Sequence, residues 1–366
     1  MRRLYILIVF LVFSSYSSWA ADKGGGACDT CADTNWSSCT SALTQTGLQQ
    51  CFDNMASGAT ITLPAGTLSA DTHRGVSDYE LPNQNQHFML HMKKAGKLIG
   101  AGKSLTTITT AYTGGNSGDV LLWYGPQADV GTTIFEMSNL TIDASTSGIV
   151  DFLGQKGDST SYPVLKVHDI NFNNGVIGVV LYGLEKGVFY SNVFTDNSQH
   201  IRVTGAASTG WSWNYDAGSE NYVFFEDNIF NTAPSLFFET GSGGRLVFRY
   251  NTATLLNEID MLDIHGKGEN YLEGQRGSVA VEVYNNTFHA LSAGQRLMFH
   301  RGGRLLMFNN TIDTNNANLA LTEYGGWYFC LQSTYPATDQ IFSSYYYNNI
   351  NSDSSTITPF LWCGTE

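Results

Sequence analysis

The stretches Tyr284-Asn-Asn-Thr-Phe288 and Phe308-Asn-Asn-Thr-Ile312 are two copies of one phrase, in which an aromatic residue, asparagines and a β-branched residue follow one another. Related phrases run back to Met137-Ser-Asn-Leu-Thr-Ile142 and forward to Tyr347-Asn-Asn-Ile350. One Asn or Asp of each phrase sets a register at Asn139, Asp169, Asn192, Asn228, Asn251, Asn286, Asn310 and Asn349. The steps between these positions are 30, 23, 36, 23, 35, 24 and 39 residues, so the short steps define a period and the long ones carry insertions.

A repeat of short strands with Asn and Gly at the corners is typical of a solenoid whose coils stack as parallel sheets. Stacked Asn side chains can bond along the axis, because neighbouring strands lie about 4.8 Å apart. The repeat therefore predicts an all-β, single-stranded, right-handed parallel β-helix with an N-terminal helical and disulfide cap. An antiparallel sandwich is the alternative, but it has no fixed residue period. Only 14% of residues are charged and Gly numbers 38, which suits a fold of paired strands and many corners.

The beginning of the chain predicts export. Met1-Arg-Arg precedes an apolar run from Leu4 to Phe13, and small residues follow up to Ala20, which is the pattern of a signal peptide over residues 1–21. A membrane anchor is the alternative, but the apolar run is short for one. We expect a disulfide-rich cap over residues 22–60, the β-helix over 61–350 and a closing cap over 351–366. The predicted location is secreted or periplasmic.

Six cysteines suit such an oxidising compartment, and they gather near the two ends of the predicted solenoid. The cysteines are Cys28, Cys31, Cys39 and Cys51 before the repeats, and Cys330 and Cys363 near the end. We expect two disulfides of open connectivity in the first group and one between the last two, with a zinc site in the first group as the alternative. The spacing of Leu48, Cys51, Phe52 and Met55 predicts a short helix over about 41–54 that covers the first coil.

A second strand of each coil ends 12 to 15 residues after the register position, usually before Gly. Its first residue is apolar in six coils, at Val179, Ile201, Phe237, Leu262, Met298 and Leu321. Since side chains alternate along a strand, the second and fourth residues should form one polar outer face. That face would carry Tyr182, Arg202, Thr204, Thr240, Asp263, His265, Arg301, Thr322 and Tyr324. Glu239, His300 and Glu323 have inward parity but lie near the corner.

Two insertions leave the coil directly after this face and should wall a cleft above it. The aromatic and charged residues that they offer to a ligand are Trp211, Trp213, Tyr215 and Arg276. Aromatic rings beside planar polar groups suit sugar rings, which have an apolar face and hydroxyl edges. Packing of the loop on the coil is the alternative role for the tryptophans. The net charge of -13 argues against nucleic acid and, after removal of the signal peptide, against anionic membranes; oligomeric state stays open.

The chain resembles the secreted pectate-lyase-like (pectin-lyase-fold) right-handed parallel β-helix superfamily. The resemblance is carried by Ile61-Thr-Leu-Pro-Ala-Gly66, by Leu98-Ile-Gly-Ala-Gly102 and by the Asn phrases, and it covers about residues 45–350. It implies a carbohydrate-active protein, often a polysaccharide lyase or a glycoside hydrolase, with its cleft on one sheet. The chain lacks the Trp-Ile-Asp-His motif of pectate lyases and the Gly-His-Gly motif of polygalacturonases.

Our leading hypothesis is β-elimination on a uronic-acid polymer, which needs a cation for the sugar carboxylate, a base and an acid. Arg202 or Arg301 would bind the carboxylate, and His265, oriented by Asp263, would be the base. Tyr182 or Tyr324 would protonate the leaving oxygen. A calcium ion held by Asp263 with Asp260 or Glu239 is an alternative to an arginine. The other hypotheses are hydrolysis by paired carboxylates and non-catalytic glycan binding or adhesion.

Overall fold

The computed structural model describes most of the predicted solenoid. The described residues are 44–72, 88–92, 94–110, 120–124, 134–144, 149–153, 164–183, 186–205, 210–211, 214–231, 236–255, 260–266, 277–290, 296–313, 318–321, 341–357 and 359–361. The predicted signal peptide and most of the predicted N-terminal cap lie outside them. Among the described residues, no helix is long and apolar enough to cross a membrane.

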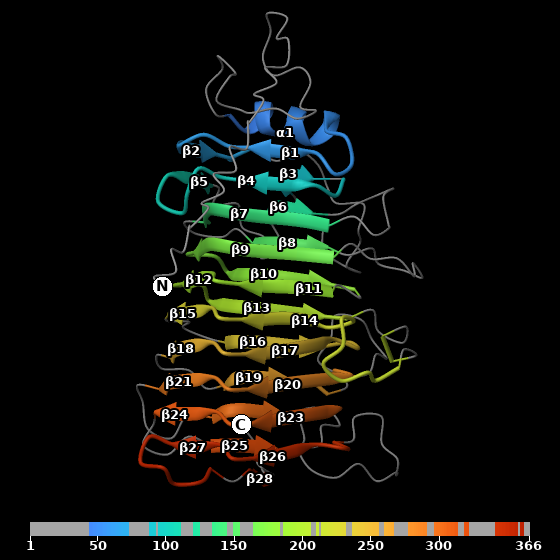
Figure 1. Ribbon diagram of the computed structural model, residues 1–366, viewed down its shortest axis with the longest axis vertical. Coiled ribbons are helices and arrows are strands. Elements are labelled where there is room, and N and C mark those ends of the chain that lie inside the picture. Colours follow the sequence, from blue (N-terminus) through green and yellow to red (C-terminus); the bar gives the residue numbers. More distant parts are fainter. Residues whose placement is uncertain are drawn as a thin grey trace, which may run out of the picture.

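Each coil contributes three strand segments, and each segment pairs in parallel with its counterpart in the next coil. The coils stack along the long axis of the molecule (Figure 1). The described strands form an 18-stranded sheet, here called sheet 1, and a 10-stranded sheet, here called sheet 2. This arrangement confirms the predicted parallel β-helix.

Sheet 1 contains the strand segments on both sides of the Asn corner, and β7 and β9 run through that corner without a break. The segments before the corner are β1 (Thr60–Thr62), β4 (Lys97–Ile99), β7 (Ile134–Asp143), β9 (Val164–Asn173), β11 (Lys186–Tyr190), β14 (Val223–Glu226), β17 (Arg245–Arg249), β20 (Ala280–Tyr284), β23 (Arg304–Phe308) and β26 (Tyr345–Tyr347). The segments after it are β2 (Gly66–Ser69), β5 (Thr106–Thr109), β12 (Val193–Thr195), β15 (Ile229–Asn231), β18 (Thr252–Leu255), β21 (Thr287–Ala290), β24 (Thr311–Asp313) and β27 (Ile350–Asn351).

Sheet 2 contains the third segment of each coil and positions the candidate site. Its strands are β3 (Phe88–Met92), β6 (Val120–Tyr124), β8 (Ile149–Leu153), β10 (Ile177–Tyr182), β13 (Gln199–Thr204), β16 (Leu236–Gly241), β19 (Asp260–Ile264), β22 (Arg296–His300), β25 (Asn318–Leu321) and β28 (Phe360–Leu361). The last strand, β28, comes from the predicted closing segment and pairs with β25.

An asparagine ladder fixes the corner between the two halves of sheet 1. The backbone N–H of Asn228 donates to Asn251 Oδ1 at 2.9 Å, and Asn251 donates in the same way to Asn286 Oδ1 at 2.9 Å. The amide group of Asn251 also donates to the carbonyl oxygen of Phe225 in the preceding coil. The ladder is buried and consists of Asn192, Asn228, Asn251, Asn286, Asn310 and Asn349. These side chains form hydrogen bonds with backbone N–H and C=O groups at the corner that would otherwise be buried without partners.

The predicted register was wrong by one residue in the first two phrases. Asn139 and Asp169 have φ of 59° and 55°, the left-handed conformation that Ser191 adopts directly before Asn192. The ladder position in their coils is therefore the next residue, which is the buried Leu140 or Ile170. The ladder begins at Asn192, whose Oδ1 accepts from the backbone N–H of Ile170. Asn and Asp tolerate the left-handed region best among non-glycine residues, so they occur at both positions.

Helix α1 (Gln45–Asn54) lies across one end of the stack (Figure 1). Thr44 caps its first turn, and Leu48 and Phe52 are fully buried in the core of the first coil. Gln49 accepts from the N–H of His91 and donates to its carbonyl oxygen, so a side chain replaces the missing neighbouring strand of β3. Cys51, the one cysteine among the described residues, is disulfide-bonded. The predicted pairing scheme for the other five cysteines lies outside those residues and stays a prediction.

Candidate functional site

The candidate site lies on the outer face of sheet 2, where four successive coils bring polar side chains into two columns. Arg202 of β13 is in register with Glu239 of β16, and Glu239 is in register with Asp263 of β19. His265 directly follows β19, and Arg301 directly follows β22. The parallel pairing continues at both residues, because the N–H of His265 donates to the carbonyl of Thr240 and the N–H of Arg301 donates to the carbonyl of Ile264. The structure therefore gathers the four predicted catalytic residues.

The strand β16 corrects one predicted register. Phe238, not Phe237, pairs with Ile201 on one side and with Leu262 on the other. A shift of one residue reverses the face of every side chain, so Glu239 joins the outer column and Thr240 points inward. The hydroxyl of Thr240 is buried against that of Ser278 at 2.7 Å. Glu239 therefore belongs to the polar network, whereas Thr240 does not.

Asp263 is the most heavily bonded carboxylate of the network. Arg301 donates to it through Nε at 3.0 Å and through Nη2 at 2.7 Å and 2.6 Å, a two-pronged pairing. The Nε2 atom of His265 lies 2.9 Å from Asp263 Oδ2. Asp263 thus lies between Arg301 and the Nε2 atom of His265, and its part in orienting the imidazole stays a prediction.

Glu239 approaches the same nitrogen of His265 as Asp263 does. Its Oε1 atom is 3.5 Å from His265 Nε2, and its Oε2 atom accepts from Arg202 Nε at 3.0 Å. Gln199 donates to the same Oε2 at 3.2 Å and accepts from Arg202 Nη2 at 3.0 Å. The order along the network is Arg202, Glu239, His265, Asp263 and Arg301, with cationic and anionic groups alternating.

Burial disfavours the charged form of each carboxylate, but the paired cations outweigh it. Burial would raise the pKa of Asp263, whereas Arg301 and His265 hold that pKa far below its ordinary range. Burial would also raise the pKa of Glu239, and Arg202 and His265 bring it below its ordinary value. Both carboxylates are therefore ionised at neutral pH.

The pKa of His265 moves the other way. Burial alone would lower it, and Arg301 opposes the imidazolium as well, but Asp263 and Glu239 together raise the pKa above its ordinary value. His265 therefore keeps its proton to a higher pH than a solvated histidine does. A buried histidine with a shifted pKa beside two ionised carboxylates is a candidate acid–base group.

The network is enclosed although it is on an outer face. The exposed fraction is 8% for Glu239, 6% for Asp263, 5% for His265 and 3% for Arg301. The side chain of Arg202 is 18% exposed, which makes it the most accessible member. A ligand approaching this face meets Arg202 first.

The donors present do not fit a calcium ion. Calcium binds six to eight oxygen ligands, whereas Arg301 occupies both oxygens of Asp263 and Arg202 occupies Oε2 of Glu239. Among the described residues, no group of three or more His, Cys, Asp and Glu side chains is arranged to hold a metal ion. Only the backbone of Asp260, the third predicted ligand, is described.

Of the aromatic residues predicted to wall the cleft, Trp211 lies at the edge of the site and Tyr215 lies outside it. Trp211 Nε1 donates to the carbonyl oxygen of Gly277 at 2.9 Å, next to the corner after His265. Tyr215 lies over the outer face of sheet 1, with its ring 4.5 Å from the guanidinium carbon of Arg304. Both tyrosine and tryptophan pack against the small apolar cluster around Tyr222 and Val247. The alternative role predicted for the tryptophans, packing of the loop on the coil, is thus observed for Trp211, and the part of Trp211 and Tyr215 in ligand binding stays a prediction.

The remaining predicted residues are only partly described. Trp213, Tyr324 and Arg276 lie outside the described residues, and Tyr182 is described only through its backbone. His300, which has inward parity, is fully buried and contacts Tyr346 Oη at 2.5 Å. Gln199 is the network residue that was not predicted from the sequence. The one sequence feature that marks it is its place as a polar residue at the start of a strand whose following residues alternate between polar and apolar.

No protein-family model and no curated protein matches the sequence. Among solved structures, the chain is similar to ORF18 of Geobacillus virus E2, with 13% identity and a TM-score of 0.36 over 86% of this chain and 58% of that chain. It is also similar to the A-module of the Azotobacter vinelandii mannuronan C-5 epimerase AlgE4, with 16% identity and a TM-score of 0.34 over 93% and 96% of the two chains. The chain thus spans less than two thirds of the viral protein. Function has to be inferred from the site itself.

Proposed function

We propose that this protein is an exported polysaccharide lyase that cleaves a uronic-acid polymer by β-elimination at the outer face of sheet 2. The observation that carries the proposal is the alternating network from Arg202 to Arg301, which holds one titratable histidine beside two ionised carboxylates. Only 14% of the residues of this chain are charged, yet four charged side chains and one histidine from four successive coils converge here.

The first step of β-elimination removes the proton from the sugar carbon that bears the carboxylate. We assign the base to His265 in its neutral form, whose Nε2 atom lies 2.9 Å from Asp263 Oδ2. Both ring nitrogens are buried, so the ring has to be uncovered before a substrate proton can reach it. The electron pair left on carbon moves into the carboxylate, which gains charge. A cation beside that group lowers the barrier, and Arg202 is the most accessible cation of the network.

In the second step the electron pair forms a carbon–carbon double bond and the bond to the leaving glycosidic oxygen breaks. The leaving oxygen takes a proton from the acid, for which Tyr182 and Tyr324 remain the predicted residues. The product is one unsaturated sugar and one new reducing end, and no water is consumed. Arg301 touches Asp263 rather than a substrate, so we assign it a positioning role instead of the predicted catalytic one.

Hydrolysis by paired carboxylates fits the site less well. A glycosidase needs one carboxyl group that is protonated at working pH so that it can donate to the leaving oxygen. Asp263 and Glu239 both carry cationic partners, and the pKa of each is lowered. Neither carboxylate is suited to be that acid.

The test is to incubate the protein, from about Asp22 onward, with acidic and neutral polysaccharides while following ultraviolet absorbance and reducing ends together. The proposal predicts that both rise on an acidic polymer and that His265→Ala abolishes the rise. His289→Ala is the matched control, because His289 is a partly exposed histidine on sheet 1. Reducing ends rising alone would indicate a hydrolase, and no reaction on any polymer, with binding retained, would indicate a glycan-binding protein.

A further inference from the structure

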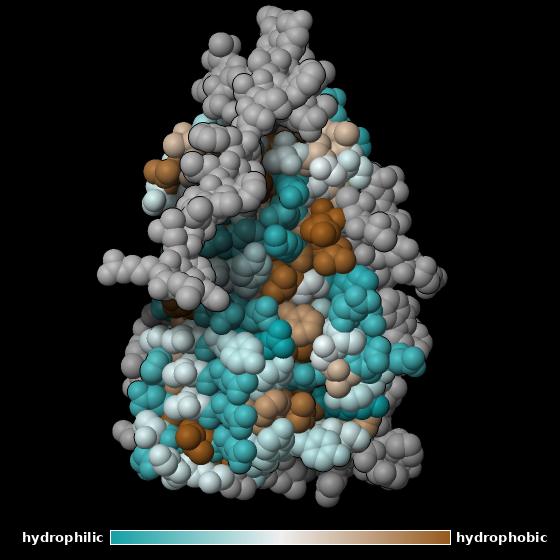
Figure 2. All heavy atoms as spheres, viewed as in Figure 1, coloured by the Kyte–Doolittle hydropathy of each residue, from teal (hydrophilic) through white to brown (hydrophobic). Residues whose placement is uncertain are grey.

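A second cluster of charged side chains lies on the outer face of sheet 1, on β4, β7 and β9 and away from the network of sheet 2. Lys97, Glu136 and Lys166 stand in register on these three neighbouring strands. Two strand spacings, about 9.5 Å, separate the two lysine backbones. Figure 2 shows hydrophilic side chains gathered over this part of the face, at the level of β4, β7 and β9 in Figure 1.

Glu136 shows how this cluster holds a carboxylate. Lys97 Nζ lies 3.0 Å from Oε2 of Glu136, and Lys166 Nζ lies 3.2 Å from Oε1. His168 Nε2 lies 3.2 Å from the same Oε1. Although burial opposes it, these partners lower the pKa of Glu136 to about 2. Three nitrogen-bearing side chains thus surround one carboxylate.

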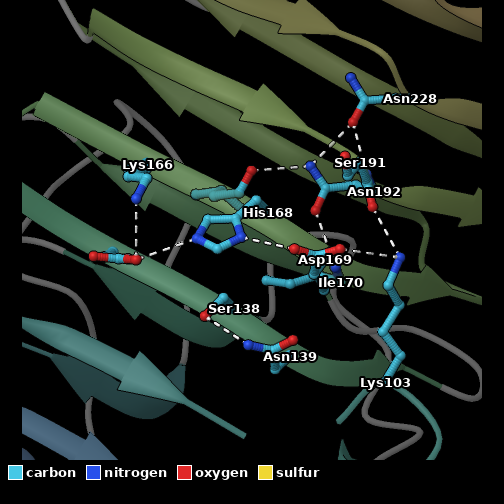
Figure 3. Close-up of polar contacts among 12 residues, drawn as sticks. Lys103, Ser138, Asn139, Lys166, His168, Asp169, Ile170, Ser191, Asn192 and Asn228 are labelled. Atoms are coloured by element: carbon cyan, nitrogen blue, oxygen red, sulfur yellow. Dashed lines mark hydrogen bonds and ion pairs between the residues drawn. The ribbon is translucent and has the colours of Figure 1, made fainter. Parts of the chain in front are cut away.

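The cluster continues through His168 to a third lysine (Figure 3). His168 Nδ1 lies 2.9 Å from Oδ2 of Asp169, whose Oδ1 is 3.8 Å from Lys103 Nζ. Lys103 also donates to the carbonyl oxygen of Ser191 at 2.9 Å. The left-handed backbone of Asp169, with φ of 55°, turns this side chain outward between the histidine and the lysine.

The charge balance of the cluster is positive in a strongly acidic protein. Three lysines face two carboxylates, a formal balance of +1, whereas the whole chain carries -13. Lys97, Lys103 and Lys166 are three of the nine lysines of the sequence. Their side chains are 46%, 33% and 39% exposed, so each presents part of its surface to a ligand in solution.

An aromatic surface adjoins the lysines. The ring of Tyr190 on β11 stacks on His168 with ring centres 4.7 Å apart and an angle of 12°. Flat rings beside cationic groups suit a sugar that carries a carboxylate, because the ring covers the apolar face of the sugar and the cation pairs with its charge.

We propose that this cluster is a second, non-catalytic binding site for an acidic polysaccharide, with Lys97, Lys103 and Lys166 pairing with sugar carboxylates and Tyr190 and His168 contacting a sugar ring. The inference takes its ligand class from the proposed function. A polymer chain held here would stay near the protein between cleavage events.

The test measures affinity of the full chain for polygalacturonate in gels that contain the polymer, at low and high salt. It is done in the His265→Ala background so that the polymer is not cut. Glu136→Gln removes the internal competitor for the lysines and should tighten binding by about twofold to fivefold at low salt. Lys97→Gln with Lys166→Gln should weaken it by about fourfold or more, and Lys97→Arg with Lys166→Arg should retain it.

Glu136→Gln keeps the test decisive if the double lysine variant does not fold. A cluster that only joins the coils predicts unchanged or weaker binding for Glu136→Gln, and that result would overturn the inference. An equal response with neutral dextran or with RNA would overturn the acidic-polysaccharide assignment. Turnover without a Glu136→Gln effect would refute this inference alone, whereas the effect without turnover would refute the proposed function alone.

Discussion

Replacement of Asp263 and Arg301 tests whether the network is an enclosed unit. Each single substitution, Asp263→Asn or Arg301→Gln, removes one side of a pair that makes three hydrogen bonds at 2.6 Å to 3.0 Å. Both residues are more than nine-tenths buried, so the remaining partner is left charged and poorly solvated. Breaking such a buried pair costs roughly 3–5 kcal/mol. Removing both partners avoids the orphaned charge, so the double variant should be more stable than the sum of the single losses by about 2–3 kcal/mol.

The assay is urea unfolding of the wild type, the two single variants and the double variant, followed by fluorescence and circular dichroism with coincident transitions. Glu226→Gln and Arg249→Gln form the matched control, because that arginine–carboxylate pair also joins adjacent strands but its side chains are 24% and 30% exposed. The control pair should show a coupling of about 0–1 kcal/mol. A coupling for Asp263 and Arg301 within the range of the control would refute the reasoning.

Three further predictions follow from the structure. In a pH profile of kcat/KM, the rate of elimination should rise with pH, and the midpoint of this rise should lie above the ordinary histidine range, because the raised pKa of His265 keeps the base protonated to a higher pH. Asp263→Asn removes one cause of the raised pKa and should move the midpoint to lower pH. Replacement of Asn251 by Ala should cost about 2–5 kcal/mol in urea unfolding, since several buried partners lose their bonds, whereas Asn171→Ala on the same sheet, with one bond to Thr141, should cost less than about 1 kcal/mol. Treatment with a chelator should leave turnover unchanged, because arginines occupy the carboxylate oxygens that a calcium ion would need; loss of turnover that calcium restores would contradict this.

The fold was predictable because its signal is local and repeated. Each ladder Asn bonds to the equivalent residue of the next coil, so one chemical requirement recurs at every corner and is visible in the sequence. The first two corners were misregistered because Asn and Asp also suit the left-handed residue beside the ladder position. Sequence alone does not separate these two uses of the same residue types.

The site was predictable as a face but not as a network. Alternation placed Arg202, Asp263, His265 and Arg301 on one side, whereas Leu236, Phe237 and Phe238 form an apolar run with no alternation to set the register of Glu239. The pairing of each arginine with a carboxylate depends on side-chain geometry across coils that lie 37 or 38 residues apart in sequence. Of the two arginines predicted as alternative partners of the substrate carboxylate, Arg301 pairs with Asp263 instead, and this pairing was not visible in the sequence.

The most direct test of the central claim is the mass of the oligosaccharides released from an acidic polymer in water enriched in heavy oxygen. β-Elimination by His265 predicts fragments whose new non-reducing ends are unsaturated and lack one water, with no heavy oxygen introduced by cleavage, and no fragments from His265→Ala. Fragments that gain one labelled water at each cut, or unchanged release by His265→Ala, would contradict the account.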